Sequence, residues 1–475
     1  MSSPVGKTVC FLSLYNGKYL RYPDEDIEGH GFPVFDHGDF ERFSLLSPYT
    51  KFKIVASSTT ATSSYVHIQS AYNNKYWVRS TNDNSWIWAG ADEINEDQTA
   101  WNCTLFEILN TNEKPNYVRI RHLQLGCYLS LWTASVFYKY GLFADSPNIR
   151  DDKRDQVEWT DTGSYFVLPK FIAFKNSASG AYLSGKVIDG QNHLQFLSSN
   201  IQDETVMHES FPKAWGGYNI QSTYFAQYWE TLAAGFYSAW IVADTKYPDR
   251  SDQTLFYVLD GGGNNLVVFK TKAEEFYCKQ YSSGNKTNCL YALNTATFDE
   301  AKFEVVETIS ERSIYGVEYR ESDARYYDKN KVLLGTNSES NANAVPIEIE
   351  FSFPYPISTK QSWNSTSSRK VFQKVSLDAQ PPESISINNA KPNGIVQDYY
   401  WGEGITISGD DAKLSVKVPP NSIVNIRFYA NHYSADIPFR YTQDDTRLDG
   451  TKVTTKLDDG LFTIINHVDF NYEIE

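Results

Sequence analysis

Short runs in which apolar and polar residues alternate recur along the first two thirds of the chain. Four clear examples are VCFLSL (9–14), YVHIQS (65–70), YVRIR (117–121) and LVVFK (266–270). Alternation with period two, rich in β-branched and aromatic residues, is typical of half-buried strands, and Asn and Gly residues between such runs are typical of hairpin turns. The pattern therefore predicts many short strands joined by tight turns.

One phrase of the sequence is written twice. IQSAYNNKYW (68–77) returns as IQSTYFAQYW (220–229), 152 positions later, with six of ten letters identical. At the same spacing Trp88 aligns with Trp240. Self-similarity at a fixed spacing is the sign of a repeated structural unit, so the first two thirds of the chain are predicted to be a tandem duplication.

Each copy contains a shorter repeat of its own. A tyrosine followed by a large or apolar residue recurs at residues 19, 76 and 128, and again at 182, 228 and 277. Three units of about four short strands predict a closed threefold barrel, the β-trefoil. The duplicated positions that alternate into the strand are expected to form core and not a binding site: Ile68, Tyr76, Trp77, Ile220, Tyr228 and Trp229.

Residues 309–475 show a different pattern. Strict alternation continues through longer runs, namely IEIEFSF (347–353), ITISGDDAKLSVKVPP (405–420) and VNIRFYA (424–430). Period two over such lengths indicates long, extended strands. The whole chain is therefore predicted to be all-β, with β-trefoil domains at 1–156 and 157–308 followed by an elongated, long-stranded β domain at 309–475.

Charge and cysteine content narrow the classes of partner and compartment. The 43 basic residues are outnumbered by 58 acidic ones, giving a net charge of −15 without any basic cluster, so no nucleic acid partner is expected. The start MSSPVGKTVC lacks the apolar region of a signal peptide, which favours a cytoplasmic or nucleocytoplasmic protein. The five cysteines form no CxxC motif and are interpreted as reduced thiols.

Motifs of catalysis are missing from the sequence. GxSxG, HExxH and the phosphate-binding GxxxxGK[ST] do not occur, so we predict no catalytic residue, no metal ligand and no cofactor. Aromatic residues make up 15% of the chain, and some of these rings are expected to serve as binding surfaces. A hydrolase that docks on its substrate through trefoils is a further alternative, but it lacks a recognisable catalytic domain.

Four segments carry a resemblance to a known family: VHIQSAYNNKYWVRS (66–80), WNCTLF (101–106), RHLQLGCYLS (121–130) and LFADS (142–146). They resemble the amaranthin family of plant lectins, whose agglutinin module is a β-trefoil present in two tandem copies. The resemblance covers residues 4–308. It implies binding of glycans or glycoconjugates that carry N-acetylgalactosamine or the Gal-GalNAc disaccharide, in a head-to-tail homodimer or a higher homo-oligomer.

The resemblance also implies where the sugar binds. In that family the site combines a loop of the first trefoil with the second trefoil of a partner subunit. The matching residues are Asp83, Asn84, Ser85 and Trp86 in the first trefoil, and Tyr237, Ser238 and Trp240 in the second. The family loop carries a histidine and a tyrosine where Asn84 and Ser85 stand, which puts the identity of the sugar in doubt. The alternative is an ordinary polar turn before a core tryptophan.

The end of the chain carries a second resemblance. VPPNSIVNIRFYA (418–430) and the segments after it resemble the stem domain of aerolysin-like β-pore-forming proteins, in which one hairpin per subunit enters a membrane. A hairpin within 369–388 is the candidate, because its apolar residues share one parity and are expected to turn inward in the soluble state. These residues are Val371, Val375, Leu377, Ala379, Ile385 and Ile387. An ordinary surface hairpin that covers the sheet is the alternative.

Two functions from different classes remain open at this stage. One is a non-catalytic lectin that selects a glycosylated surface, where its third domain assembles on the membrane in plant defence. The other is a structural or interaction scaffold of tandem trefoils without pore activity, since a fold does not fix a function.

Overall fold

A computed structural model of the chain describes most of its residues. The described ranges are 4–23, 31–36, 45–58, 65–134, 138–213, 216–235, 238–248, 251–263, 265–293, 301–366, 374–385, 401–402 and 404–474. Their secondary structure is almost entirely β, with five one-turn 3-10 helices in these ranges: η1 (Pro48–Thr50), η2 (Glu204–Val206), η3 (Asp252–Thr254), η5 (Glu321–Asp323) and η6 (Glu383–Ile385).

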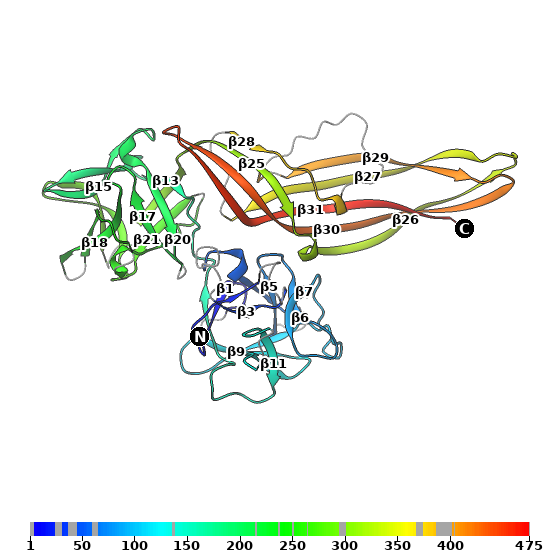
Figure 1. Cartoon of the computed structure of the whole chain (residues 1–475), viewed down its shortest axis with the longest axis horizontal. Coiled ribbons are helices and arrows are strands. Elements are labelled where there is room, and N and C mark those ends of the chain that lie inside the picture. The colour runs from blue at the N-terminus through cyan, green and yellow to red at the C-terminus, as the bar shows by residue number, and fades with distance from the viewer. Residues whose placement is uncertain are drawn as a thin grey trace. The chain divides into compact units, whose positions relative to one another are not determined.

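The first trefoil is a closed barrel whose strands are joined by three hairpins (Figure 1). Its strands are β1 (Thr8–Ser13), β2 (Leu20–Arg21), β3 (Val34–Phe35), β4 (Phe52–Ala56), β5 (Tyr65–Ser70), β6 (Tyr76–Arg79), β7 (Ile87–Ala91), β8 (Phe106–Asn110), β9 (Tyr117–His122), β10 (Cys127–Leu131), β11 (Leu142–Ser146) and β12 (Val157–Asp161). Around the barrel β1 pairs with β4, then β5, β8, β9 and β12 follow, and β12 pairs back with β1. The hairpins β2–β3, β6–β7 and β10–β11 meet through the bridges Val34–Gly141 and Trp86–Phe143.

The second trefoil repeats this order. Its strands are β13 (Phe171–Asn176), β14 (Tyr182–Ile188), β15 (Gln191–Ser198), β16 (His208–Pro212), β17 (Gly217–Ser222), β18 (Gln227–Gly235), β19 (Ser238–Thr245), β20 (Phe256–Asp260), β21 (Leu266–Thr271), β22 (Tyr277–Ser283), β23 (Lys286–Leu293) and β24 (Lys302–Glu307). Here β13, β16, β17, β20, β21 and β24 close the barrel, and β14–β15, β18–β19 and β22–β23 are the hairpins. The predicted tandem β-trefoils are confirmed.

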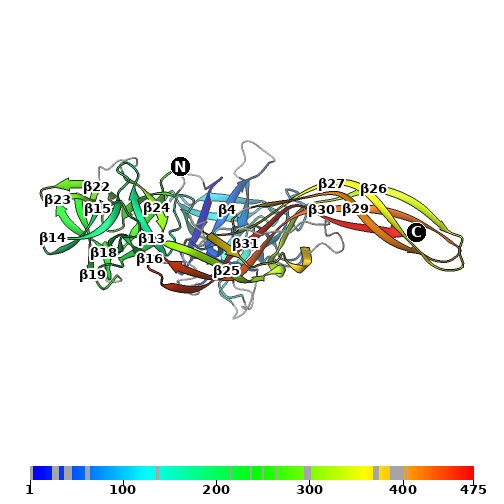
Figure 2. The ribbon, with the colours of Figure 1, turned by 90° about the horizontal axis from the view of Figure 1, so that it is seen from above.

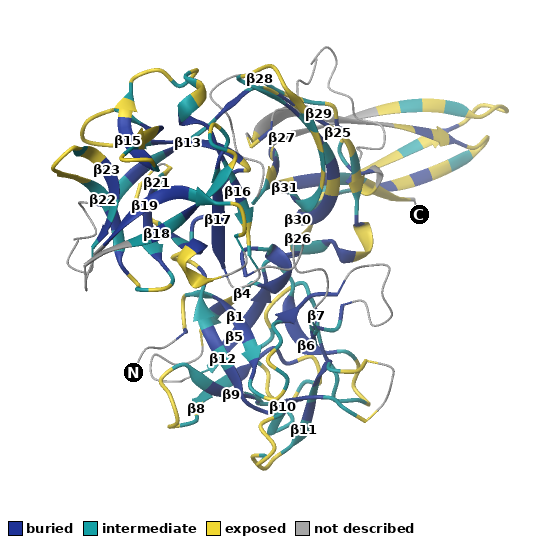
Figure 3. Cartoon of the chain, turned by 60° about the vertical axis from the view of Figure 1, so that its left-hand side comes forward, coloured by how far each residue is buried: buried dark blue, intermediate teal, exposed yellow. Residues whose placement is uncertain are grey.

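The duplicated phrase lies in the barrel core, as predicted. Ile68, Trp77, Ile220 and Trp229 are completely buried, and Tyr76 is buried as well. Tyr228 is half-buried. Figure 3 shows the barrel strands largely in the colour of buried residues.

The structure corrects the predicted end of the first trefoil. A boundary after residue 156 removes β12, which the barrel needs because it fills the gap between β9 and β1. The first trefoil therefore extends to Asp161. The tyrosine repeat marks one strand in each unit and gives no signal for this last strand.

The rest of the chain forms a sheet of long strands. They are β25 (Ile309–Tyr319), β26 (Arg325–Asn341), β27 (Ile347–Ser365), β28 (Lys374–Leu377), β29 (Ile405–Val418), β30 (Ser422–Arg447) and β31 (Lys452–Ile474). The order across the sheet is β28-β25-β30-β31-β27-β29, with β26 paired to β30. In Figure 2 the hairpins β26–β27 and β29–β30 continue beyond the rest of this sheet. The predicted elongated, long-stranded domain is confirmed.

Contacts group the chain into two compact units. One is Met1–Arg312 with Thr366–Lys374 and Asp444–Thr454, and the other is Ser313–Ser365 with Val375–Gln443 and Thr455–Glu475. The second unit has its own core, centred on the buried rings of Trp363, Trp401, Phe439 and Phe462.

The predicted hairpin at 369–388 has one strand and not two in its described residues. β28 lies at the edge of the sheet beside β25, but the segment that follows forms the 3-10 helix η6. Pro381 and Pro382 explain the difference, because a proline lacks the N–H that a strand ladder needs. Val371 and Ile387 lie outside the described residues.

Candidate functional site

The loop between β6 and β7 is braced by the side chain of Asn84. Its Oδ1 accepts hydrogen bonds from the Ser80 hydroxyl (2.8 Å) and from the backbone N–H of Trp86 (3.1 Å). Its Nδ2 donates to Oγ1 of Thr81 (2.8 Å). Asn84 was predicted to contact a sugar, but the structure uses both ends of its amide to hold the loop.

The buried Arg79 supports the same loop from the strand side. Its guanidinium donates to the carbonyl oxygens of Asn82 (2.9 Å) and Asn84 (2.7 Å), and to Oε1 of Gln124 (2.9 Å). Because a guanidinium has a rigid fork of donors, these bonds fix the loop backbone relative to the strand. The loop is therefore a preformed turn.

Asp83 is the exposed carboxylate of this loop. It accepts a hydrogen bond from the Thr81 hydroxyl, and this bond lowers the pKa of Asp83 below its ordinary value. The carboxylate is thus an ionised hydrogen-bond acceptor at neutral pH, which suits a sugar hydroxyl. Ser85 is half-buried, and its carbonyl oxygen accepts the N–H of Ala144 (2.9 Å).

Trp86 is half-buried in a cluster of rings. Its ring centroid lies 4.9 Å from Phe143, 5.5 Å from Trp132 and 5.2 Å from Tyr138. Phe32 lies 6.3 Å from Trp86 and packs on Trp88 as well. Tyr138 is the most accessible of these rings, at 36% exposure.

These six residues form what we term the aromatic cap of the first trefoil: Phe32, Trp86, Trp88, Trp132, Tyr138 and Phe143. They come from all three hairpin regions, so residues far apart in sequence build one surface. Trp86 is the one cap residue that the sequence predicted as part of the sugar site. Only the count of aromatic residues signalled the others, because the meeting of the hairpins is a property of the barrel.

The second-trefoil candidates are less accessible. Tyr237 lies outside the described residues, and Ser238 begins β19. Trp240 is 9% exposed, with Tyr291 at 4.6 Å and Tyr281 at 6.1 Å between ring centroids. Nζ of Lys286 lies 5.3 Å from its ring centroid. Trp240 therefore belongs to the packing of the hairpins.

Hairpin register corrects the pairing of Trp88 with Trp240. Val78 faces Trp88 in the first trefoil, and its counterpart Glu230 faces Val242 in the second. Trp240 is bridged to Tyr291 as Trp86 is bridged to Phe143, so Trp240 is the structural counterpart of Trp86. The fixed spacing failed here because the turn of the second hairpin is longer.

The candidate membrane segment turns its apolar side inward, as expected. Ala379 and Ile385 are buried in the core of the second unit, and Val375 and Leu377 pack against that core. The intervening Ser376 and Asp378 are exposed. Ser376 Oγ lies 3.0 Å from Ser313 Oγ on β25, and the N–H of Asp378 donates to the carbonyl of Ile314 (2.8 Å).

Two buried histidines serve the barrels. His208 Nδ1 accepts the indole N–H of Trp229 (3.3 Å), and burial lowers its pKa to about 4. His122 Nδ1 accepts the N–H of Leu125 (3.3 Å), and burial lowers its pKa to about 4 as well. Both rings are neutral at pH 7 and act in packing.

Within the ranges that the structure describes, no group of three or more His, Cys, Asp or Glu side chains is placed to hold a metal ion. No helix among those residues is long and apolar enough to span a membrane. All five cysteines are free thiols.

Comparison with known proteins gives one family and several distant structures. The sequence model of the agglutinin domain family matches residues 4–161 and 166–310 of this chain. Among solved structures, the hemolytic lectin CEL-III is 8% identical over 98% of this chain and 93% of its own, with a TM-score of 0.29. No curated protein sequence matches.

Two further structures are similar at the same low level. A mosquitocidal holotoxin is 13% identical over 66% of this chain with a TM-score of 0.29, and the chain covers 36% of the holotoxin's length. The designed threefold-symmetric protein ThreeFoil is 10% identical over 29% of this chain and 98% of its own, with a TM-score of 0.25.

Proposed function

The chain belongs to the family of agglutinin-domain lectins, and from that premise we propose that its first trefoil binds glycans carrying N-acetylgalactosamine or Gal-GalNAc. The site combines the loop 80–86 with the aromatic cap. The third domain is an assembly module that oligomerises on a glycosylated membrane and forms pores in defence. No catalytic role is part of the proposal.

The exposed Asp83 beside the aromatic cap is the observation that carries this function. A pyranose offers an apolar C–H face and a rim of hydroxyl groups. Aromatic rings pack on the C–H face, and a carboxylate accepts hydrogen bonds from the hydroxyl groups. Because Asn84 and Arg79 hold the loop in place, little ordering is needed on binding.

Titration of N-acetylgalactosamine into the intact chain tests the proposal. Asp83→Ala should weaken binding at least about tenfold, since a hydrogen bond to a charged group is lost. Asp97→Ala is the matched control, because Asp97 is also an exposed carboxylate that a threonine hydroxyl bonds, at 2.7 Å, outside the cap. Equal affinity of the two variants for the sugar would contradict the proposed site. Failure of the wild type to bind any N-acetylgalactosamine glycan would contradict the proposed function.

The family resemblance also supports a head-to-tail homodimer. In that arrangement the second trefoil of a partner subunit completes the sugar site. Sedimentation equilibrium measures the oligomeric state. A chain that binds sugar while strictly monomeric would show that one subunit is sufficient.

A scaffold without sugar binding is the second candidate. The observation that favours it is the low exposure of Trp240, whose ring is used in packing. If the intact chain binds no glycan on an array, the scaffold function is favoured over the lectin function.

A further inference from the structure

The two trefoils share an arrangement of three rings. In the second trefoil the centroid of Trp240 lies 4.6 Å from Tyr291 and 6.1 Å from Tyr281, and the two tyrosines are 4.7 Å apart. By hairpin register these residues are the counterparts of Trp86, Phe143 and Trp132. The corresponding centroid distances in the first trefoil are 4.9, 5.5 and 4.9 Å.

A ring arrangement present in both barrels has a shared structural cause. In each trefoil the tryptophan strand pairs with a strand of the third hairpin at this point, and the three rings fill the space where the hairpins meet. We term this set the ring triad. Trp86 therefore belongs to the closure of the barrel end, whatever ligand is bound.

The first trefoil adds further rings to its triad. Trp88 stands where the second trefoil has Val242, and Phe32 packs on Trp88 with 6.0 Å between centroids. The ring of Tyr138 contacts both groups, with its centroid 5.2 Å from that of Trp86 and 5.0 Å from that of Phe32. It is the most exposed residue of the cap, at 36% of its surface, so it offers a ligand more surface than any other member.

The backbone holds Tyr138 in an unusual conformation. Its φ is +54°, and that of Tyr140 is +67°; both are left-handed values that bulky side chains rarely adopt, so the conformation belongs to the turn and not to Tyr138 alone. The turn is kept by hydrogen bonds from Gly141 N to Tyr138 O (2.8 Å) and from Tyr140 N to Trp132 O (2.8 Å). A Cβ on Gly141 would come within 3.0 Å of the Tyr138 carbonyl oxygen and 3.2 Å of the Trp86 ring, so a larger residue would have to push these groups away by a few tenths of an ångström. Strained positions of this kind recur at binding sites.

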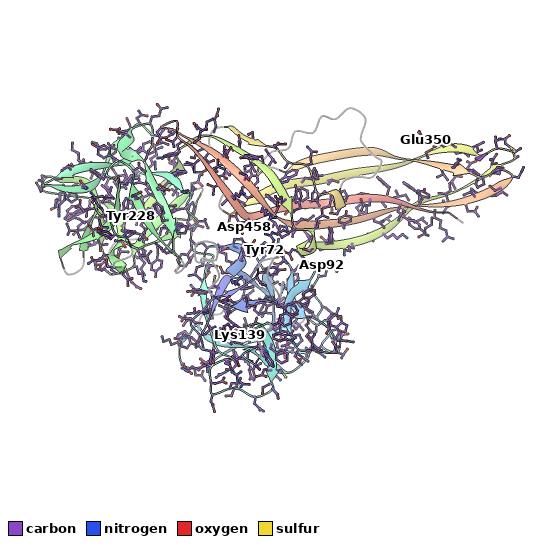
Figure 4. The ribbon with its side chains drawn as sticks, viewed as in Figure 1. Tyr72, Asp92, Lys139, Tyr228, Glu350 and Asp458 are labelled. Atoms are coloured by element: carbon purple, nitrogen blue, oxygen red, sulfur yellow. The ribbon has the colours of Figure 1, made fainter. Side chains whose placement is uncertain are left out.

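The neighbouring tyrosine is not equally available. Lys139 and Lys18 place their Nζ atoms 5.1 and 5.5 Å from the ring centroid of Tyr140. Figure 4 labels Lys139 in the first trefoil. The ring of Tyr140 is thus engaged by two ammonium groups, while Tyr138 rests on other rings with part of its surface open to solvent.

We propose that Tyr138 is the ring that contacts the apolar face of the sugar, and that Trp86 supports it from beneath. The assignment rests on the proposed glycan-binding function and names a residue that the family loop does not include. Asp83 stands three residues before Trp86, and its carboxylate accepts hydrogen bonds from hydroxyl groups at the rim of the same sugar.

Three variants of the intact chain test this assignment by calorimetric titration with N-acetylgalactosamine. Tyr138→Ala should bind about five- to tenfold more weakly, as expected for loss of one stacking ring, while its thermal midpoint stays close to wild type. Tyr138→Phe keeps the ring and should restore affinity to within about threefold. Tyr15→Ala is the matched control, because Tyr15 is a 47%-exposed tyrosine of the first trefoil that is not part of the aromatic cap.

The outcomes separate this inference from the function on which it rests. Wild-type affinity in Tyr138→Ala, together with weakened binding in Asp83→Ala, would overturn the role of Tyr138 and leave sugar binding by the loop intact. Failure of the wild type to bind any glycan of this class would overturn both. A large loss in Tyr15→Ala would also count against the assignment, because the effect would then not be specific to the cap.

Discussion

At the scale of single residues, the first-trefoil loop shows what a sequence signal can and cannot give. The resemblance to the amaranthin family assigned Asp83, Asn84 and Trp86 to a sugar site, and the structure shows that they share one braced turn. The resemblance could not show that Asn84 spends its amide inside the loop, or that Trp86 is half-buried, because both depend on atoms brought from Ser80 and from the third hairpin. The sequence predicted which residue types the loop carries, but not which of their side chains face the solvent and which face the loop itself.

Replacement of Trp86 tests its assignment to the ring triad. Trp86→Ala should lower the free energy of unfolding by about 3 kcal/mol, the low end for loss of a buried aromatic ring, since Trp86 is half-buried. Denaturation with urea measures this. Trp101→Ala removes a 44%-exposed indole from the same trefoil and should cost less than about 0.5 kcal/mol. An equal loss of unfolding free energy in the two variants would show that Trp86 does not stabilise the barrel.

Acid should weaken the barrels through their buried histidines. In the folded chain the pKa of His208 is lowered from 6.5 to about 4, so the unfolded chain binds the proton first as pH falls. Stability from this group is complete above about pH 6.5 and is lost between there and pH 4, by an amount on the order of 3 kcal/mol. Urea unfolding at pH 7, 5.5 and 4.5 measures the slope. His208→Gln should make that slope shallower, and an unchanged slope would assign the pH dependence to other groups.

At the scale of elements, the segment β28 to η6 shows both the strength and the limit of pattern. Its parity was predicted correctly, because burial of alternate residues against a sheet follows from period two alone. A second strand is not formed in the described residues, because Pro381 and Pro382 lack the N–H of a strand ladder and Glu383–Ile385 forms η6. An engineered disulfide between β28 and β25 can test whether this segment leaves the sheet.

A disulfide between β28 and β25 would hold the two strands together. Ser376 and Ser313 have their hydroxyl oxygens 3.0 Å apart, so cysteines at both positions are close enough to be bridged. If pore formation requires β28 to peel away, the oxidised double variant should bind glycan normally but release no dye from vesicles that display it. Reduction should restore release. The single variant Ser376→Cys is the control, and leakage that is equal before and after oxidation would rule out this movement.

At the scale of the whole molecule, all-β class, tandem duplication and long C-terminal strands were all visible in the sequence, because each leaves a periodic trace. The end of the first barrel and the surface built by its three hairpins were not visible. Closure joins strands such as β1 and β12 that lie at opposite ends of the repeat, and no local pattern records such a pairing. Long-range ion pairs escape the sequence for the same reason.

One such group of ion pairs joins Arg312 to Asp445, which is 133 positions away, and also to the nearby Glu307. The buried guanidinium of Arg312 donates to Asp445 (2.7 and 2.9 Å) and to Glu307 (2.8 Å). Arg312→Ala leaves two buried carboxylates without their cation and should cost about 3–5 kcal/mol in urea unfolding. Lys331→Ala breaks the exposed pair with Glu473 (2.9 Å) and should cost less than about 1 kcal/mol. A similar loss of unfolding free energy in both variants would mean that the ion pairs of Arg312 are open to solvent.

The pairing of β12 with β1 also sets the order of events during synthesis. Val9 pairs with Asp161, so the first barrel cannot close until the ribosome has released nearly the whole repeat. Until then its hairpins can form locally, but the apolar faces of β4, β5, β8 and β9 have no complete core to enter. A nascent chain arrested before Val157 should therefore stay sensitive to protease and bind chaperones, and one extended well past Asp161 should become resistant in a single step.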